Sequence, residues 1–119
     1  ELPASSYTEI RFEEDLFALY QLFDIFVHVP INPRIEAFGQ TYIEALAAGV
    51  PSVFTLSGIA VEFVADGQNA LVVPFQDSEA ICAAMCKIVS DESLRNRLIA
   101  NGRESIQTRF GLHQMIQKL

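Results

Sequence analysis

The stretch I-E-A-F-G-Q-T-Y-I-E-A-L-A-A-G-V, residues 35–50, decides the fold and carries the candidate site. A helix is predicted from about Gln40 to Ala48, after a loop that contains Pro and Asn. Two glutamates stand eight residues apart, Glu36 in the loop and Glu44 inside the helix. If Gly39 opens the helix, free backbone N–H groups and the positive end of the helix dipole face the same space as the Glu36 carboxylate. Such a tip can hold a polyanion while a carboxylate takes hydroxyl groups beside it.

Working outward from this helix, hydrophobic periodicity predicts alternating strands and helices. The predicted strands are residues 8–12, 24–29, 51–54 and 70–73. The other predicted helices are residues 15–23, 61–64, 77–89, 92–108 and 112–119. The alternation indicates an α/β fold with a parallel sheet of about four strands and helices on both faces. Ligands of such sheets bind at the carboxyl ends of the strands, where the loops 30–40 and 55–59 fall.

The composition limits the class of protein. With 119 residues, half of them apolar, the chain has the length of one compact domain. Its formal net charge of −7 argues against nucleic acid as a partner, because a phosphate backbone requires a basic face. A nucleotide remains compatible, since backbone amides and one or two cations can neutralise a diphosphate locally. No apolar run reaches the roughly 18–20 residues of a membrane span.

The residues that most often bind metals give no cluster in this sequence. Cys82 and Cys86 stand four apart on a predicted helix without a nearby histidine, and we expect them to be packing residues rather than metal or redox ligands. His28, in the middle of a predicted strand, is expected to be a buried histidine with one hydrogen-bonded nitrogen rather than a catalytic group. We therefore expect no metal and no cofactor. Free thiols suit a reducing cytoplasm, which is the expected location.

The run E-A-F-G-Q-T-Y-I-E-A-L-A-A-G-V-P and the later segment D-G-Q-N-A-L-V-V-P resemble the donor-binding half of retaining glycosyltransferases of the GT-B fold, in particular glycosyltransferase family 4, or group 1. Their signature is Glu-x7-Glu with Phe-Gly after the first Glu, then Gly-x-Pro, then Asp-Gly and Leu-Val-x-Pro. The match extends from about Phe12 to Phe110. The resemblance implies a Rossmann-like sheet that forms part of the C-terminal domain of a GT-B fold.

The resemblance also assigns roles to individual residues. Glu36 would lie at the donor sugar, position it and stabilise the positive charge that develops on its ring. Glu44 would accept both ribose hydroxyls of a nucleoside-diphosphate sugar, because a carboxylate offers two acceptor oxygens. The amides of Phe38, Gly39 and Gln40 would face the sugar or the distal phosphate, with Gly39 required because a β-carbon would block the approach. The family retains anomeric configuration and needs no divalent metal.

Several alternatives stay open at this point. Glu44 could instead be a solvated residue on an outward helix face, and Glu36 an ordinary loop carboxylate. The family often has Gly-Gly where this chain has Gly58-Ile59, aligned from Glu62, a residue expected to have a structural role. Other functions on the same fold are a nucleotide-sugar epimerase and a non-catalytic binding module. A dinucleotide oxidoreductase is disfavoured because the sequence has no Gly-x-Gly-x-x-Gly.

The resemblance implies that residues 1–119 are a partial C-terminal domain. We expect its upstream strands, an N-terminal acceptor-binding domain, and the Arg and Lys that neutralise the donor diphosphate to lie outside this sequence. The expected partners are a nucleotide-sugar donor, with the base open between UDP, GDP and ADP, and an acceptor bound by the absent domain. Peripheral association with a membrane is compatible with the sequence. Alone, this piece is expected to be inactive and to self-associate through an uncovered sheet edge.

Overall fold

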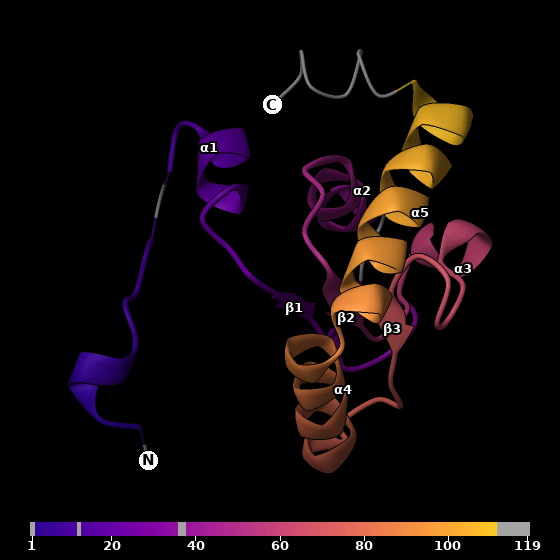
Figure 1. Ribbon diagram of the computed structural model, residues 1–119. Helices are drawn as coiled ribbons and strands as arrows, with labels where there is room; N and C mark the ends of the chain where they lie inside the picture. The colour runs from indigo at the N-terminus through magenta and orange to yellow at the C-terminus, as the bar shows by residue number, and fades with distance from the viewer. Residues whose placement is uncertain (1, 12, 36–37, 112–119) are drawn as a thin grey trace.

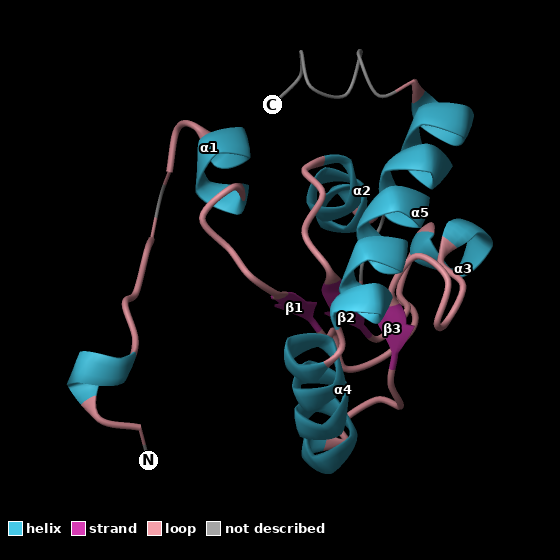
Figure 2. Cartoon of the chain, in the orientation of Figure 1, coloured by secondary structure: helices cyan, strands magenta, loops and turns pink. Residues whose placement is uncertain are grey.

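The computed structural model describes residues 2–11, 13–35 and 38–111. At its centre is a parallel sheet whose strands lie in the order β1 (Phe26–His28), β2 (Ser52–Phe54) and β3 (Leu71–Val72). In the register of the sheet, Val53 lies opposite Val27 on one side and Leu71 on the other. Figure 2 shows these short strands in the middle of the molecule, with helices around them.

The helices are η1 (Ala4–Ser6), α1 (Leu16–Tyr20), α2 (Gln40–Ala47), α3 (Ala60–Phe63), α4 (Ser78–Ser90) and α5 (Glu92–Phe110). Three of them begin after an aspartate that caps the first turn. The carboxylates of Asp15, Asp77 and Asp91 accept hydrogen bonds of 2.9–3.0 Å from the N–H three residues further on. Each cap satisfies one of the helix's unpaired donors and stabilises the helix by about 1 kcal/mol.

Helices cover both faces of the sheet, as predicted. Alternate residues of β2 point to opposite sides, so Phe54 packs in one buried cluster and Val53 in the other. The Phe54 cluster is formed mainly by α2, together with α1, α3 and the last turns of α5. The Val53 cluster is formed by α4 and the first turns of α5. Figure 1 shows α5 running from beside α4 to beside α2, so this one helix contributes to both layers.

The predicted strand at residues 8–12 is wrong. Thr8–Arg11 are exposed and have no regular secondary structure, and residue 12 lies outside the described residues. The sheet among the described residues therefore has three strands rather than about four. A strand is defined by its ladder partner, and in the described part of the chain β1 pairs only with β2. Figure 1 shows the segment around η1 lying apart from the packed body.

The prediction that Cys82 and Cys86 are packing residues is also wrong, because both are exposed. The inward positions of α4 are Ala84 and Ile88, which are buried. Each cysteine stands two residues from an inward position, and a two-residue step rotates a helical side chain by about 200°. The two thiols therefore face solvent.

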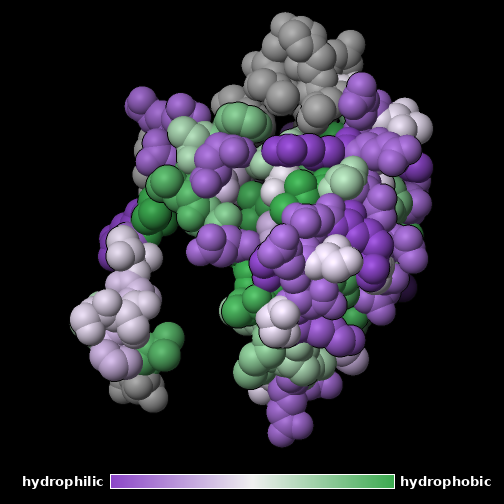
Figure 3. All heavy atoms as spheres, viewed as in Figure 1, coloured by the Kyte–Doolittle hydropathy of each residue, from purple (hydrophilic) through white to green (hydrophobic). Residues whose placement is uncertain are grey.

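Figure 3 shows hydrophobic atoms gathered over α1, whereas the visible surface of α5 is mostly hydrophilic.

The predicted helix at residues 112–119 lies outside the described residues.

Candidate functional site

The two loops predicted to bind ligands meet at the carboxyl edge of the sheet. One leads from β1 to α2 and the other from β2 to α3. Three hydrogen bonds join them, from Thr55 Oγ1 to the Pro30 carbonyl (2.6 Å), from the Gly58 N–H to the Pro33 carbonyl (3.1 Å) and from the Ile59 N–H to the Phe38 carbonyl (3.1 Å). Backbone groups make most of these contacts, so the two loops form one surface whose shape depends little on side-chain rotamers.

Tyr42, in the first turn of α2, fastens the helix to this surface. Its hydroxyl donates to the Thr55 carbonyl (2.6 Å) and accepts from the Ser57 N–H (3.1 Å). Its ring lies edge-on to His28 and Phe54, with centroid distances of 4.9 and 4.7 Å. All of the Tyr42 side chain is buried. Tyr42 therefore holds the tip of α2 in place, and His28 packs against the Tyr42 ring.

Gly39 caps α2 with φ of 92°, in the left-handed region that favours glycine. A β-carbon there would lie 2.9 Å from Tyr42 Cδ2, so packing inside the protein already requires glycine, apart from any effect on a ligand. Gly39 itself is buried, but Phe38 is 47% exposed and Gln40 is exposed. In the first turn the Tyr42 N–H donates to the Gly39 carbonyl (3.2 Å), whereas the N–H groups of Gln40 and Thr41 come before any carbonyl of the helix with which they could pair. Their dipoles, on the open side of the tip, favour an anion.

Glu44 lies one turn into α2, half-buried, and accepts a hydrogen bond from the Tyr20 hydroxyl at 3.3 Å. The Gln40 side chain is a second hydrogen-bond partner of the carboxylate. Burial raises the pKa of Glu44, and the hydrogen bonds from Tyr20 and Gln40 oppose this shift. Burial also raises the pKa of Tyr20, as does the nearby Glu44 charge, so its phenol stays protonated and donates. Glu44 is therefore not a freely solvated helix residue.

Four predicted site residues thus lie at the start of α2: Phe38 and Gly39 just before the helix, Gln40 at its first position and Glu44 one turn further on. Glu36, the predicted catalytic residue, lies outside the described residues.

The contact between Tyr20 and Glu44 was not predicted from the sequence. A signal was present, because a buried tyrosine hydroxyl usually finds a hydrogen-bond partner. The identity of that partner could not be read from the sequence, since Tyr20 and Glu44 belong to different helices. The same holds for Tyr42, whose partners Thr55 and Ser57 lie on the next loop.

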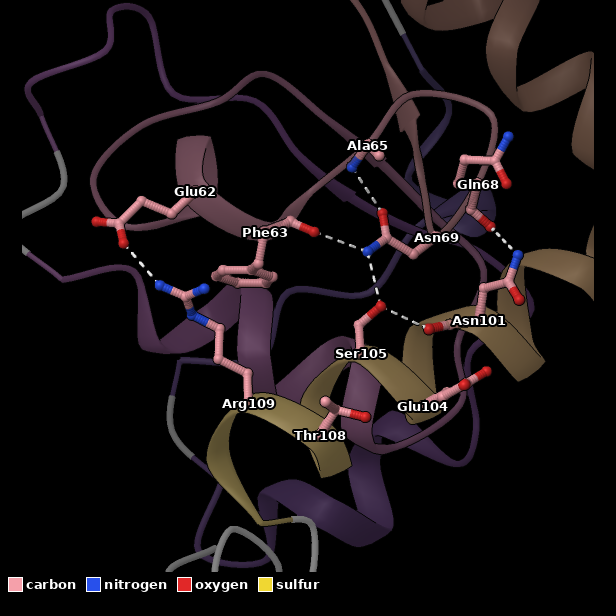
Figure 4. A pocket seen from close by; sticks show the side chains of 10 residues that line it. All are labelled: Glu62, Phe63, Ala65, Gln68, Asn69, Asn101, Glu104, Ser105, Thr108 and Arg109. Carbon is pink, nitrogen blue, oxygen red and sulfur yellow. Dashed lines mark hydrogen bonds and ion pairs between the residues drawn. The ribbon is translucent and has the colours of Figure 1, made fainter.

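A cavity of about 500 Å³ lies elsewhere, between the α3 region and α5 (Figure 4). Glu62 and Arg109 form an ion pair at its rim, at 2.6 Å. The Asn69 amide donates to the Phe63 carbonyl (2.9 Å) and to Ser105 Oγ (3.0 Å). These polar groups bind one another, and no predicted donor-site residue lines the cavity. These contacts hold the α3 region against α5. The cavity is separate from the surface at the tip of α2.

In residues 2–11, 13–35 and 38–111, no group of three or more His, Cys, Asp or Glu side chains is arranged to hold a metal ion. Within the same ranges, no helix has both the length and the apolar character needed to cross a lipid bilayer.

The fold and site define a class: a Rossmann-like α/β unit with an anion-favouring helix tip and a hydrogen-bonded carboxylate at the carboxyl edge of its sheet. Residues 7–105 match the family described as "Glycosyl transferases group 1". The chain belongs to this family, and the resemblance inferred from residues 36–51 and 66–74 is confirmed.

Individual relatives agree with the family assignment. The chain is 34% identical over 107 residues to mannosylfructose-phosphate synthase of Agrobacterium fabrum, covering 90% of this chain and 23% of that protein. It is 40% identical over 95 residues to probable sucrose-phosphate synthase 2 of Arabidopsis thaliana, covering 79% of this chain and 9% of that protein. The chain thus spans less than a quarter of the length of either relative.

Solved structures agree on the fold. The crystal structure of Anabaena Alr3699/HepE in complex with UDP-glucose superposes with a TM-score of 0.78 at 24% identity, covering 90% of this chain and 29% of that one. The predicted α/β class and the relation to GT-B glycosyltransferases are confirmed, with the strand count corrected from about four to three.

Proposed function

We propose that this chain is the donor-binding portion, within the C-terminal domain, of a retaining and metal-independent glycosyltransferase. The enzyme moves a sugar from a nucleoside-diphosphate sugar to an acceptor hydroxyl, in the synthesis of a glycan or glycoconjugate. The observation that carries the proposal is the position of Glu44. It is a half-buried carboxylate with defined hydrogen-bond donors, one helical turn from the open tip of α2.

The tip of α2 and the Glu44 carboxylate bind different parts of the donor. The diphosphate lies against the N–H groups of Gln40 and Thr41 at the start of α2, where the helix dipole favours negative charge. The ribose lies over Glu44, whose oxygens accept from the two ribose hydroxyls. Glu36 serves the sugar end of the same ligand, eight residues earlier in the sequence. The order of groups along the donor then follows the order of the protein groups from the loop into the helix.

This arrangement suits a transfer that uses no metal. The bond to the leaving group breaks as negative charge grows on the diphosphate, and fixed N–H dipoles stabilise that charge without reorganisation during the reaction. Tyr42 and the three loop hydrogen bonds keep those dipoles in place. Cations that complete the diphosphate site, and the groups that recognise the acceptor, are proposed to lie outside this chain. The proposed location of the enzyme is the cytoplasm.

Membership of a transferase family favours sugar transfer over the two other functions considered on this fold, a nucleotide-sugar epimerase and a non-catalytic module. An epimerase would return a changed sugar from the donor with no acceptor present. A binding module would hold the nucleotide sugar without turnover. Incubating the full-length protein with a labelled donor, with and without an acceptor, separates these reactions by their products.

The test of the donor site is a calorimetric titration of the protein with UDP, GDP and ADP, repeated for Glu44→Ala. Because hydrogen bonds to a charged group contribute about 1.5–3 kcal/mol each, the substitution should weaken the preferred nucleotide by roughly tenfold or more. Glu104→Ala is the matched control, since Glu104 lines the separate cavity beside α5. Equal nucleotide affinity in the wild type and Glu44→Ala would contradict the proposal.

A further inference from the structure

We infer that Tyr20 is a positioning residue for the donor site: its hydroxyl, fixed by the packing of α1, holds the Glu44 carboxylate in the orientation that receives the ribose hydroxyls. This inference rests on the proposed role of Glu44. Tyr20 comes from α1, 24 residues before Glu44 in the sequence.

The position of the Tyr20 hydroxyl is set by its surroundings rather than by Glu44 alone. The side chain is 6% exposed. Its ring packs edge-on against Phe23 and Phe26, with centroid distances of 5.8 and 5.4 Å. The following residue, Gln21, donates from Nε2 to the carbonyl of Ala48 at 2.9 Å. The α1 segment is thus attached to α2 at two places, through Tyr20 to Glu44 and through Gln21 to Ala48. These contacts and the ring packing fix the Tyr20 hydroxyl in place.

The chemistry of the pair makes the contact directional. An ionised carboxylate only accepts hydrogen bonds, and a phenol has one O–H to give. Tyr20 therefore occupies one acceptor position on Glu44 Oε1 and Gln40 takes another on the carboxylate, and of the roughly four acceptor positions the others can receive further donors. A ribose diol is a pair of such donors. Without the phenol, the carboxylate would have to be ordered by the ligand at the time of binding, and that ordering would weaken the affinity.

A second donor comes from the same helix. The Gln40 side chain, one turn before Glu44, also hydrogen-bonds the carboxylate. Gln40 is exposed at the tip of α2, whereas Tyr20 is buried. The buried partner is the one whose geometry is constrained, so it determines the orientation. A ring that only filled space would serve equally well as phenylalanine, and this difference can be measured.

The experiment compares Tyr20→Phe with the wild type, using the nucleoside diphosphate that the protein prefers and its 2′-deoxy analogue as ligands. Phenylalanine keeps the ring contacts and removes only the hydroxyl. Loss of one hydrogen bond should weaken binding of the ribonucleotide by roughly three- to tenfold. The 2′-deoxy analogue, which lacks one of the two ribose hydroxyls, should lose less, so the preference of the protein for ribose should shrink.

Two further variants complete the design. Tyr7→Phe is the matched control, because Tyr7 is 57% exposed and it should bind both ligands as the wild type does. In a Glu44→Ala background, Tyr20→Phe should have no further effect on either affinity, since Tyr20 acts through Glu44.

The outcomes separate this inference from the proposed function. Equal losses for the ribonucleotide and the 2′-deoxy analogue, or no loss for either, would overturn the positioning role of Tyr20. A Glu44→Ala variant that binds the nucleotide as the wild type does would overturn the donor site itself, whatever Tyr20→Phe shows. A reduced ribose preference in Tyr20→Phe that disappears in the Glu44→Ala background would support both.

Discussion

The hydroxyl of Tyr42 donates a 2.6 Å hydrogen bond to the carbonyl oxygen of Thr55, and both residues are buried. Tyr42 stands in the first turn of α2, and Thr55 directly follows β2. This contact ties the helix tip to the neighbouring loop at the carboxyl edge of the sheet. The helix tip proposed to hold the diphosphate is therefore anchored to the packed core.

Tyr42→Phe should destabilise the protein and weaken nucleotide binding together. The substitution leaves the Thr55 carbonyl and the Ser57 N–H without the hydroxyl that pairs with them. Leaving buried polar groups unsatisfied costs about 1–3 kcal/mol each. Urea denaturation should show a loss of about 2–6 kcal/mol for the two groups together, with nucleotide affinity reduced as the tip of α2 loosens. Unchanged stability would show that the hydroxyl does not hold the two loops together.

Gly39→Ala should cost more stability than Gly67→Ala. Both glycines have positive φ, 92° and 79°, so both substitutions carry the backbone strain of about 1–2 kcal/mol. A β-carbon at Gly39 would also meet the Tyr42 ring at 2.9 Å, whereas at Gly67 nothing lies within 4 Å. Overpacking of this kind typically costs a further 1–3 kcal/mol, roughly. Equal losses in chemical denaturation would mean that the Tyr42 ring yields freely.

The raised pKa of Glu44 predicts a pH effect on stability. Burial lifts the pKa of the folded state above the ordinary value of 4.5, so the folded protein keeps this proton at a pH where the unfolded chain has lost it. The stability that Glu44 contributes is then fully present below about pH 4.5 and declines as the pH rises through the raised value. Relative to Glu44→Gln, the wild type should therefore lose free energy of unfolding with rising pH.

Urea denaturation of both proteins at a series of pH values from 4 to 8 measures this difference directly. Glu44→Gln is the suitable reference because it keeps the shape of the side chain and removes only the titration. A difference that grows in favour of the wild type as the pH rises would mean that Tyr20 and Gln40 outweigh the effect of burial.

In the full-length enzyme, Glu36→Gln should lower turnover by more than it weakens nucleotide binding. The proposed role of Glu36 is at the donor sugar, where charge develops during transfer, while Glu44 and the helix tip bind the nucleotide. An interaction made mainly in the transition state affects kcat more than affinity. Steady-state kinetics and nucleotide titration on the same variant give the two quantities. Comparable losses in both would contradict this division of roles.

The helices and the parallel order of strands could be predicted because they depend on local pattern. Amphipathic spacing located α2, α4 and α5 to within about two residues, the accuracy expected for element ends. The strand at residues 8–12 could not be judged from the sequence, since an apolar alternation does not say whether a neighbouring strand is available. The burial of the two cysteines of α4 was mispredicted for another reason. The expectation followed from residue type, whereas their position around the helix places them on the solvent side.

The sequence could predict where four of the candidate site residues lie, and their roles stay a prediction. Signature residues Phe38, Gly39, Gln40 and Glu44 lie close together in the sequence, so the helix that carries them also brings them together in space. The residues that hold this site in place could not be predicted from spacing. Tyr20 reaches Glu44 from α1, and Thr55, which binds Tyr42, lies in the loop after β2. Contacts between separate elements depend on the way the helices pack, which periodicity alone does not specify.

The most direct test of the central claim is a crystal structure of the protein with its preferred nucleoside diphosphate bound. We expect the ribose hydroxyls within hydrogen-bonding distance of the Glu44 carboxylate and the phosphates against the N–H groups at the start of α2. A nucleotide bound away from α2, for example in the cavity between α3 and α5, would contradict the claim.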